Sequence, residues 1–302
     1  MPPLDHENEV TKEEISFKTP DGLALRADAW GNSRGKPVLL LHGGGQTRHA
    51  WAGTASALAN AGWYAVSLDM RGHGDSDWCP HGNYDHASFA ADIGAVAQSF
   101  ESPPILVGAS LGGMSSLFAL AQARKEKRPP PAAALVLVDI ATRMEIDGAR
   151  RILAFMSQKP DGFESLEEAA EAIASYNPHR PRPRDLTGLK KNLRLREDGR
   201  YRWHWDPAFI DGRLTPGSMN TLDSLDNAAR GLRIPTLLVR GRMSDLLSQE
   251  GADEFLRQVP HARFVDVSGA GHMVAGDRND VFTRAVLDFL NTELRGANRV
   301  RT

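Results

Sequence analysis

The sequence contains very little cysteine and no long hydrophobic run. Cys79 is the single cysteine among 302 residues, which excludes an intramolecular disulfide and a cysteine-rich metal site. No apolar stretch approaches the roughly 20 residues that span a bilayer. The first residues, MPPLDHENEVTKEE, lack the basic start and apolar centre of a secretory signal. From these absences we expect a cytoplasmic protein with no membrane partner.

An excess of charge of one sign is also missing. Lysine and arginine total 36 against 38 acidic residues, giving a formal net charge of -2. Because such a chain has no overall field that attracts polyanions, we expect no nucleic-acid partner. The 41% of hydrophobic residues can form a large core. The length fits one large domain with an insertion or two medium domains, and the oligomeric state is left open, a homodimer included.

Short apolar runs alternate with longer helical patterns along most of the chain. Most of the runs are apolar at successive positions, which is typical of parallel strands buried on both faces. The alternation predicts an α/β fold, a mostly parallel sheet with helices on both faces. The predicted strands are 37–43, 63–69, 104–110, 134–140, 235–241 and 262–269, with an antiparallel hairpin at 14–19 and 23–30 on one edge. The predicted helices lie near 49–61, 85–99, 112–126, 249–258 and 279–293.

The alternation breaks between residues 142 and 231. This segment is charged, contains several prolines and shows no clear strand pattern. Ser165 and Glu168 form a capping-box pattern that predicts a helix over 166–176, and a second helix is predicted over 186–196. About ninety residues are too many for a loop. We therefore expect a helical cap at 142–231, inserted into a core domain formed by 1–141 and 232–302.

The segment ILVGASLGGM contains the pattern G-x-S-x-G at Gly108, Ser110 and Gly112. The pattern follows a predicted strand and precedes a predicted helix, which is the context in which it presents a nucleophile. The turn must be so sharp that residues two positions from the serine need to be nearly free of side chains. Ser110 would then be exposed at the carboxyl end of its strand, next to the positive end of the following helix.

A serine nucleophile needs a base and a carboxylate that orients the base. His272 lies in SGAGHMVAGD, between the last predicted strand and the last helix. Asp245 lies beyond the strand LLVRG, so the chain order is Ser, Asp, His, which is the order that the predicted architecture uses for such a triad. Asp139, at the end of ALVLVD, is the alternative acid, since both aspartates follow strand ends. We favour Asp245 for holding the tautomer of the imidazole, with Asp139 as an anchor for the start of the insertion.

Glycines follow the strand LLLHGGG directly. Glycine lets backbone amides come close to a substrate oxygen, so the N–H groups of Gly44 and Leu111 are the candidate oxyanion hole. In the insertion, YRWHWDP offers Trp203, His204 and Trp205. Together with Gly45 these could line a substrate pocket, although aromatic packing of the insertion onto the core explains them equally well.

A second glycine-containing loop, DMRGHGDS at 69–76, has neither the lysine of a P-loop nor the spacing of a dinucleotide fingerprint. We interpret it as a braced loop. No other ligands are spaced to make His73 a metal ligand, and no metal site is predicted.

In this order, the HGGG loop, RGHGDS, G-x-S-x-G, Asp245 and His272 resemble the α/β-hydrolase-fold superfamily over about 14–141 and 232–293. The resemblance implies an eight-stranded, mostly parallel sheet, with the insertion where that superfamily carries its cap. It implies Ser110 as nucleophile, His272 as base and Asp245 as acid, with no metal or organic cofactor. The serine argues against haloalkane dehalogenases and epoxide hydrolases, which use aspartate there.

The expected function is a serine hydrolase that cleaves a small carboxylic ester or lactone through an acyl-enzyme on Ser110. The same residues also suit carbon–carbon bond hydrolysis of a diketone, or perhydrolysis. A ligand receptor on a hydrolase scaffold is the more distant alternative, because fold alone does not determine function.

Overall fold

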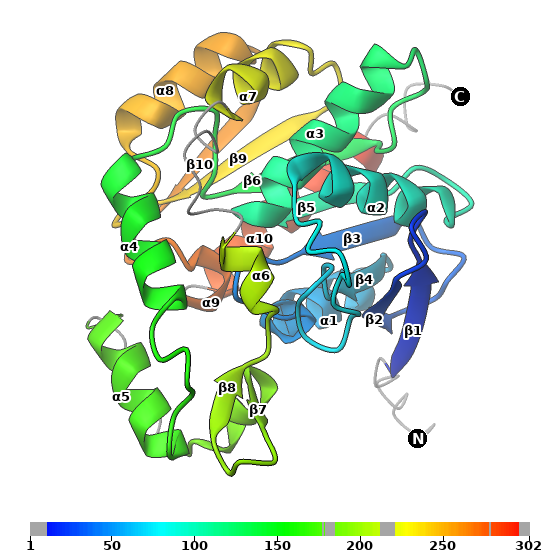
Figure 1. The fold of residues 1–302 in the computed structure, drawn as a ribbon. Helices are drawn as coiled ribbons and strands as arrows, with labels where there is room; N and C mark the ends of the chain where they lie inside the picture. Colours follow the sequence, from blue (N-terminus) through cyan, green and yellow to red (C-terminus); the bar gives the residue numbers. More distant parts are fainter. Residues whose placement is uncertain (1–10, 177, 179–184, 212–220, 278, 296–302) are drawn as a thin grey trace, which may run out of the picture.

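An eight-stranded sheet organises the molecule in a computed structural model, which describes residues 11–176, 178, 185–211, 221–277 and 279–295. The strand order is β1-β2-β4-β3-β5-β6-β9-β10. Only β2 pairs antiparallel with its neighbours in this sheet, and the other pairs are parallel, which confirms the predicted eight-stranded, mostly parallel sheet (Figure 1). The bounds are β1 Lys12–Lys18, β2 Ala24–Trp30, β3 Pro37–Leu41, β4 Tyr64–Leu68, β5 Ile105–Ala109, β6 Ala134–Val138, β9 Thr236–Gly241 and β10 Arg263–Val267.

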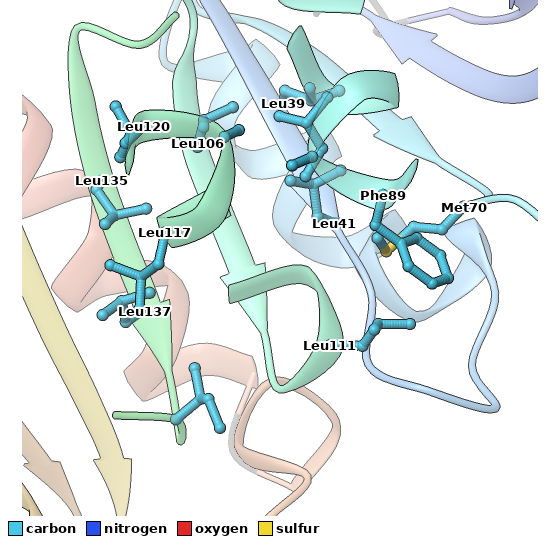
Figure 2. Packing of buried hydrophobic residues seen from close by; sticks show 14 of the residues in the cluster. Leu39, Leu41, Met70, Phe89, Leu106, Leu111, Leu117, Leu120, Leu135 and Leu137 are labelled. Carbon is cyan, nitrogen blue, oxygen red and sulfur yellow. The ribbon is translucent and has the colours of Figure 1, made fainter. Parts of the chain in front are cut away.

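Successive residues of the central strands contribute to two different hydrophobic clusters. In β3, Leu39 and Leu41 belong to one cluster, whereas Val38 and Leu40 belong to the other. Because strand side chains alternate between the faces of a sheet, a strand covered on both faces is apolar at every position. Figure 2 shows the first cluster, where leucines of β3, β5 and β6 meet Leu117 and Leu120 of α3 and Phe89 of α2.

Helices cover both faces of the sheet, as predicted. Buried residues of α1 and α10 join the cluster of Val38, and those of α2, α3 and α8 join the cluster of Leu39. Two of the starts carry side-chain caps: Asp85 accepts the Ser88 N–H at 2.7 Å, and Ser248 accepts the Gly251 N–H at 3.2 Å. The bounds are α1 Ala52–Asn60, α2 His86–Gln98, α3 Leu111–Lys125, α8 Gln249–Gln258 and α10 Asn279–Leu290, with shorter helical segments η1 Arg48–Trp51, α9 Val274–Asp277 and η4 Asn291–Arg295.

The segment between β6 and β9 is a mixed insertion. The predicted helix 166–176 is confirmed, and the Ser165 hydroxyl accepts the Glu168 N–H at 3.1 Å. The predicted helix 186–196 is wrong. The chain instead forms η2 and then the hairpin of β7 and β8, with Gly199 at a φ of 77° in the turn. The bounds are α4 Ile146–Met156, α5 Leu166–Tyr176, η2 Thr187–Lys191, β7 Leu193–Leu195, β8 Tyr201–Trp203, α6 Pro207–Asp211 and α7 Thr221–Arg230.

The elements of the insertion lie at different distances from the sheet. In Figure 1, α5 and the β7–β8 hairpin project away from it, whereas α4 and α6 lie nearer the sheet. The last helix, α7, buries Leu225 in the same cluster as α3 and α8. Within the described ranges, no helix combines the length and the apolar character needed to cross a membrane.

Candidate active site

Ser110 occupies a strained turn between β5 and α3. Its φ of 45° and ψ of -109° lie outside the regions that ordinary residues favour. The residue stands at the N-terminal end of a 15-residue helix, where the helix dipole favours negative charge. Strain of this kind is concentrated at functional positions. The structure therefore places Ser110 as the sequence predicted, at the carboxyl end of its strand.

The glycines around Ser110 are required by close approach of the backbone. A Cβ on Gly108 would lie 2.5 Å from the carbonyl carbon of Gly112, and a Cβ on Gly112 would lie 2.4 Å from the Leu41 carbonyl oxygen. Both separations are shorter than real Cβ contacts. Any side chain at either position would push strand and helix apart and open the turn that holds the serine.

His272 is oriented by Asp139. The Nδ1 atom of His272 lies 2.7 Å from Oδ2 of Asp139. The carboxylate is fully buried and also accepts the Ser244 hydroxyl at 2.5 Å and the Gly241 N–H at 2.9 Å. A buried carboxylate with all these donors can hold an imidazole in one tautomer, with Nε2 directed away from it.

The prediction of Asp245 as the orienting carboxylate is therefore wrong, and the alternative, Asp139, takes its place. Asp245 bonds Arg151 of α4 at 2.9 Å, with 42% of its side chain exposed. The physical reason lies in the loop after β9, which directs Ser244 rather than Asp245 toward Asp139. Sequence reasoning assigned no role to Ser244, and serine in a loop carries no signal that would have marked it.

The glycine loop after β3 lies beside Ser110. A Cβ on Gly43 would lie 3.5 Å from Cβ of Ser110. Among the residues that the structure describes, no acceptor bonds the N–H of Gly44 or of Leu111. The arrangement is compatible with the predicted oxyanion hole formed by these two groups.

His42 braces the glycine loop from within the core. It is fully buried, its Nε2 accepts the Met70 N–H at 3.0 Å, and its Nδ1 lies 2.8 Å from the Gly43 carbonyl oxygen. This pairing requires the neutral tautomer with the proton on Nδ1, and burial lowers the pKa of His42. A neutral ring with both nitrogens engaged acts as a support for the loop.

The other face of the glycine loop packs against the insertion. A Cβ on Gly45 would lie 2.9 Å from Cε of Met156 and 3.2 Å from the Trp205 ring, and one on Gly44 would lie 3.5 Å from Phe209. Trp203 stacks on Trp205 at a centroid distance of 4.8 Å. Trp205 is thus in place beside the candidate site, next to Met156 and Phe209, which sequence reasoning did not mark.

His204 joins the insertion to two loops of the core. Its Nδ1 accepts the Gly74 N–H at 2.7 Å, and its Nε2 lies 3.2 Å from the Gly45 carbonyl oxygen. Burial lowers the pKa of His204 to about 3, so the ring is neutral at ordinary pH. With both nitrogens engaged, His204 anchors the insertion, while contact of Gly45, Trp203 and Trp205 with substrate stays a prediction.

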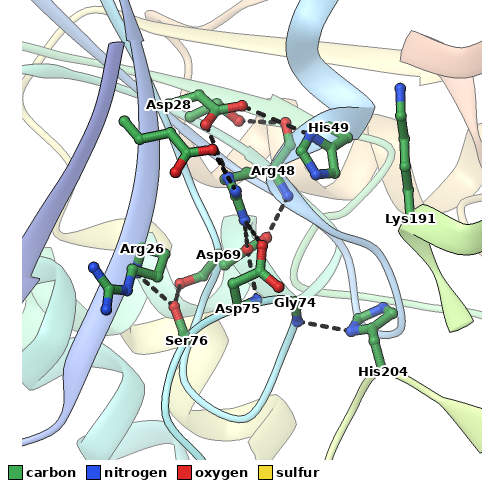
Figure 3. Close-up of polar contacts among 12 residues, drawn as sticks. Arg26, Asp28, Arg48, His49, Asp69, Gly74, Asp75, Ser76, Lys191 and His204 are labelled. Carbon is green, nitrogen blue, oxygen red and sulfur yellow. Dashed lines mark hydrogen bonds and ion pairs between the residues drawn. The ribbon is translucent and has the colours of Figure 1, made fainter. Parts of the chain in front are cut away.

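The loop 69–76 is braced by charge, as Figure 3 shows. The buried guanidinium of Arg48 bonds Asp69, bonds Asp28 at 3.0 Å and bonds Asp75 at 2.7 Å. Asp75 also bonds Arg194 of β7 at 2.8 Å. Burial opposes the charge of Asp75, but the two arginines lower its pKa. The loop is therefore a platform on which the insertion docks. No group of three His, Cys, Asp or Glu side chains in the described ranges is placed to hold a metal ion.

Comparison with known proteins identifies the family. The model of the alpha/beta hydrolase fold matches residues 36–278. The chain belongs to the α/β-hydrolase-fold family. The esterase Rv0045c of Mycobacterium tuberculosis is 28% identical over 276 residues, covering 89% of this chain and 87% of that one. Protein phosphatase methylesterase 1 of Bos taurus is 31% identical over 144 residues, covering 46% of this chain and 37% of that one.

A solved structure gives the same result for the α/β-hydrolase fold. The crystal structure of E-2-(acetamidomethylene)succinate hydrolase superimposes with a TM-score of 0.79 at 25% identity, covering 92% of this chain and all of that one. These relatives are hydrolases, two of them esterases by name, and they support an enzyme of the α/β-hydrolase class with esterase activity.

Proposed function

We propose that this α/β hydrolase cleaves small carboxylic esters, lactones included, through an acyl-enzyme on Ser110. The observation that carries the proposal is the hydrogen bond of 2.7 Å between His272 and the buried Asp139. Asp139 follows the carboxyl end of β6, next to the end of β5 where Ser110 occupies its strained turn. The esterases among the relatives favour an ester over the other bonds that such a site can hydrolyse.

The mechanism follows from the roles of these groups. His272 takes the Ser110 proton through Nε2 as Oγ attacks the carbonyl carbon, and Asp139 stabilises the imidazolium that forms. The N–H groups of Gly44 and Leu111 stabilise the oxyanion. His272 then protonates the leaving alcohol, which gives the acyl-enzyme. A water molecule, activated by the same imidazole, releases the acid and restores Ser110.

The experiment compares the wild-type protein with Ser110→Ala on short-chain p-nitrophenyl esters, lactones and a diketone. We expect turnover of esters or lactones, and a loss of about 10⁴-fold or more in kcat for the variant. Ser115→Ala is a matched control, since the hydroxyl of this buried serine on the same helix donates to the Leu111 carbonyl oxygen at 2.7 Å. Full ester hydrolysis by Ser110→Ala would contradict the proposal, and turnover of the diketone alone would replace it with carbon–carbon bond hydrolysis.

A further inference from the structure

The Gln46 side chain connects the glycine loop to the loop that carries His272. Its Oε1 accepts the Gly43 N–H at 3.0 Å, and its Nε2 donates to Sδ of Met273 at 2.7 Å. The backbone N–H of Gln46 also donates to the Gly43 carbonyl oxygen at 3.1 Å. One residue thus holds both peptide groups of Gly43 and contacts the neighbour of the catalytic histidine.

The direction of the Gly44 N–H follows from these contacts. In a trans peptide, the carbonyl oxygen and the N–H of the next residue point in opposite directions, and the structure contains no cis peptide among its described residues. The Gly43 carbonyl oxygen is held by the Gln46 N–H and by Nδ1 of His42. The Gly44 N–H must therefore point away from both of these donors.

The same contacts decide which glycine supplies the oxyanion donor. The Gly43 N–H is already taken by Oε1 of Gln46, although Gly43 is the glycine that lies against Ser110. The Gln46 side chain thus fixes the peptide that precedes Gly43. Without it, the Gly43 carbonyl oxygen is still held by the Gln46 N–H and by Nδ1 of His42, but the other side of Gly43 is released, and glycine tolerates a wide range of backbone angles. The Gly44 N–H would then be directed less firmly.

We propose that Gln46 is a positioning residue for the oxyanion hole, and that its contact with Met273 keeps the glycine loop in register with the His272 loop. The inference rests on the proposed function, because it assigns Gln46 a role in stabilising the oxyanion formed on Ser110. The effect belongs to the transition state, so it lowers kcat and leaves substrate binding nearly unchanged.

The test replaces Gln46 by Met, which keeps the length of the side chain and removes its amide. Removal of one oxyanion donor costs about 10²–10³-fold, and a donor that is misdirected rather than removed should cost less. We expect kcat to fall about 10- to 100-fold, with KM within about threefold. Gln46→Asn, whose shorter side chain cannot span from Gly43 to Met273, should behave alike and serves if the first variant does not fold.

An aryl trifluoromethyl ketone reports on the oxyanion directly. Ser110 Oγ bonds to its carbonyl carbon, the hydroxyl proton passes to His272, and the carbonyl π electrons become the oxyanion. We expect its inhibition constant to rise by the factor by which kcat/KM falls. Gln122→Met is the matched control, since the Gln122 side chain donates to Glu126 in an exposed contact on α3. The kinetic and inhibition constants of this variant should equal those of the wild type.

The outcomes separate this inference from the proposed function. A kcat within about threefold of the wild type for both Gln46 variants would overturn the role of Gln46, as would a rate loss without weaker ketone inhibition. A wild-type protein that turns over no ester or lactone and does not react with a fluorophosphonate at Ser110 would instead overturn the proposed function and, with it, this inference.

Discussion

Replacing Asp139 with Asn tests the orienting role of the buried carboxylate. Asp139 accepts from His272 and Ser244 through one oxygen and from the Gly241 N–H through the other. An amide has one oxygen, so its NH₂ group must face a donor on one side. If it faces His272, the imidazole adopts the wrong tautomer, and a change of this type lowers kcat by about 10⁴-fold in serine proteases.

The other orientation of the amide has a cost in stability. With the amide oxygen toward His272, the NH₂ group of the substituted side chain would oppose the Gly241 N–H in a fully buried site. An unsatisfied buried donor costs about 1–3 kcal/mol. Because this cost disfavours that orientation, we expect the NH₂ group of the substituted side chain to face His272. The main effect of Asp139→Asn is then the loss of rate, and the free energy of unfolding falls by less than this amount.

Asp245→Asn is the matched control, measured with Asp139→Asn by initial rates on p-nitrophenyl acetate and by urea unfolding. Its ion pair with Arg151 is half exposed, and such pairs contribute about 0–1 kcal/mol. We expect kcat within about threefold of the wild type for Asp245→Asn. The reasoning is refuted if this control loses activity as severely as we expect for Asp139→Asn while Asp139→Asn stays active.

Three further predictions concern the packing of the insertion and its platform. Because the pKa of His204 is about 3 in the folded protein and near 6.5 when unfolded, only the unfolded chain binds this proton between those values. The free energy of unfolding should therefore fall with acidification by up to about 1.4 kcal/mol per pH unit. His204→Asn should flatten the dependence of Tm on pH between 6.5 and 4.5, and a variant whose Tm varies with pH as steeply as that of the wild type would contradict this. Tyr84→Phe removes the 2.5 Å hydrogen bond to the buried Asp206. We expect the free energy of unfolding, measured in urea, to fall by about 1–3 kcal/mol, and a change near zero would contradict this. In Gly74→Ala, at a φ of +57°, the added Cβ would lie 2.1 Å from Asp69, so we expect the free energy of unfolding to fall by about 2–4 kcal/mol. Gly188→Ala is the control, since nothing lies within 4 Å of a Cβ there, and it should change stability little. Equal Tm values for the two variants would contradict the close approach at Gly74.

The sheet and its helices were predictable because burial on both faces leaves a plain pattern. Runs such as PVLLL and ALVLV are apolar at each position, and the structure places them in β3 and β6 at the centre of the sheet. The hairpin of β7 and β8 has no such pattern. Its residues LRL and YRW carry arginine in the middle and are only partly buried, so charge at these positions concealed a strand that contacts the core at few points.

The contacts of polar side chains around Ser110 could be predicted only in part. The histidine and glycine motifs have fixed spacing, so Ser110, His272 and the loop at Gly44 could be located in the sequence. Gln46 could not, because its role depends on a bond to Met273, which is 227 positions away. A hydrogen bond between loops leaves no periodic signal in either of them.

The choice between Asp139 and Asp245 depends on the register of the strands. In the pairing of β5 with β6, Ala109 lies opposite Val138, and Val138 in turn lies opposite Val239 of β9. Ser110 and Asp139 are therefore the first residues beyond two neighbouring strands, and both have positive φ, 45° and 50°. The sheet itself holds these two backbones next to each other. Asp245 comes four residues after the end of β9, so its position depends on the path of a loop. Where two acids compete for one histidine, the acid that directly follows a strand next to the nucleophile strand has the position that pairing fixes, and here that acid is Asp139.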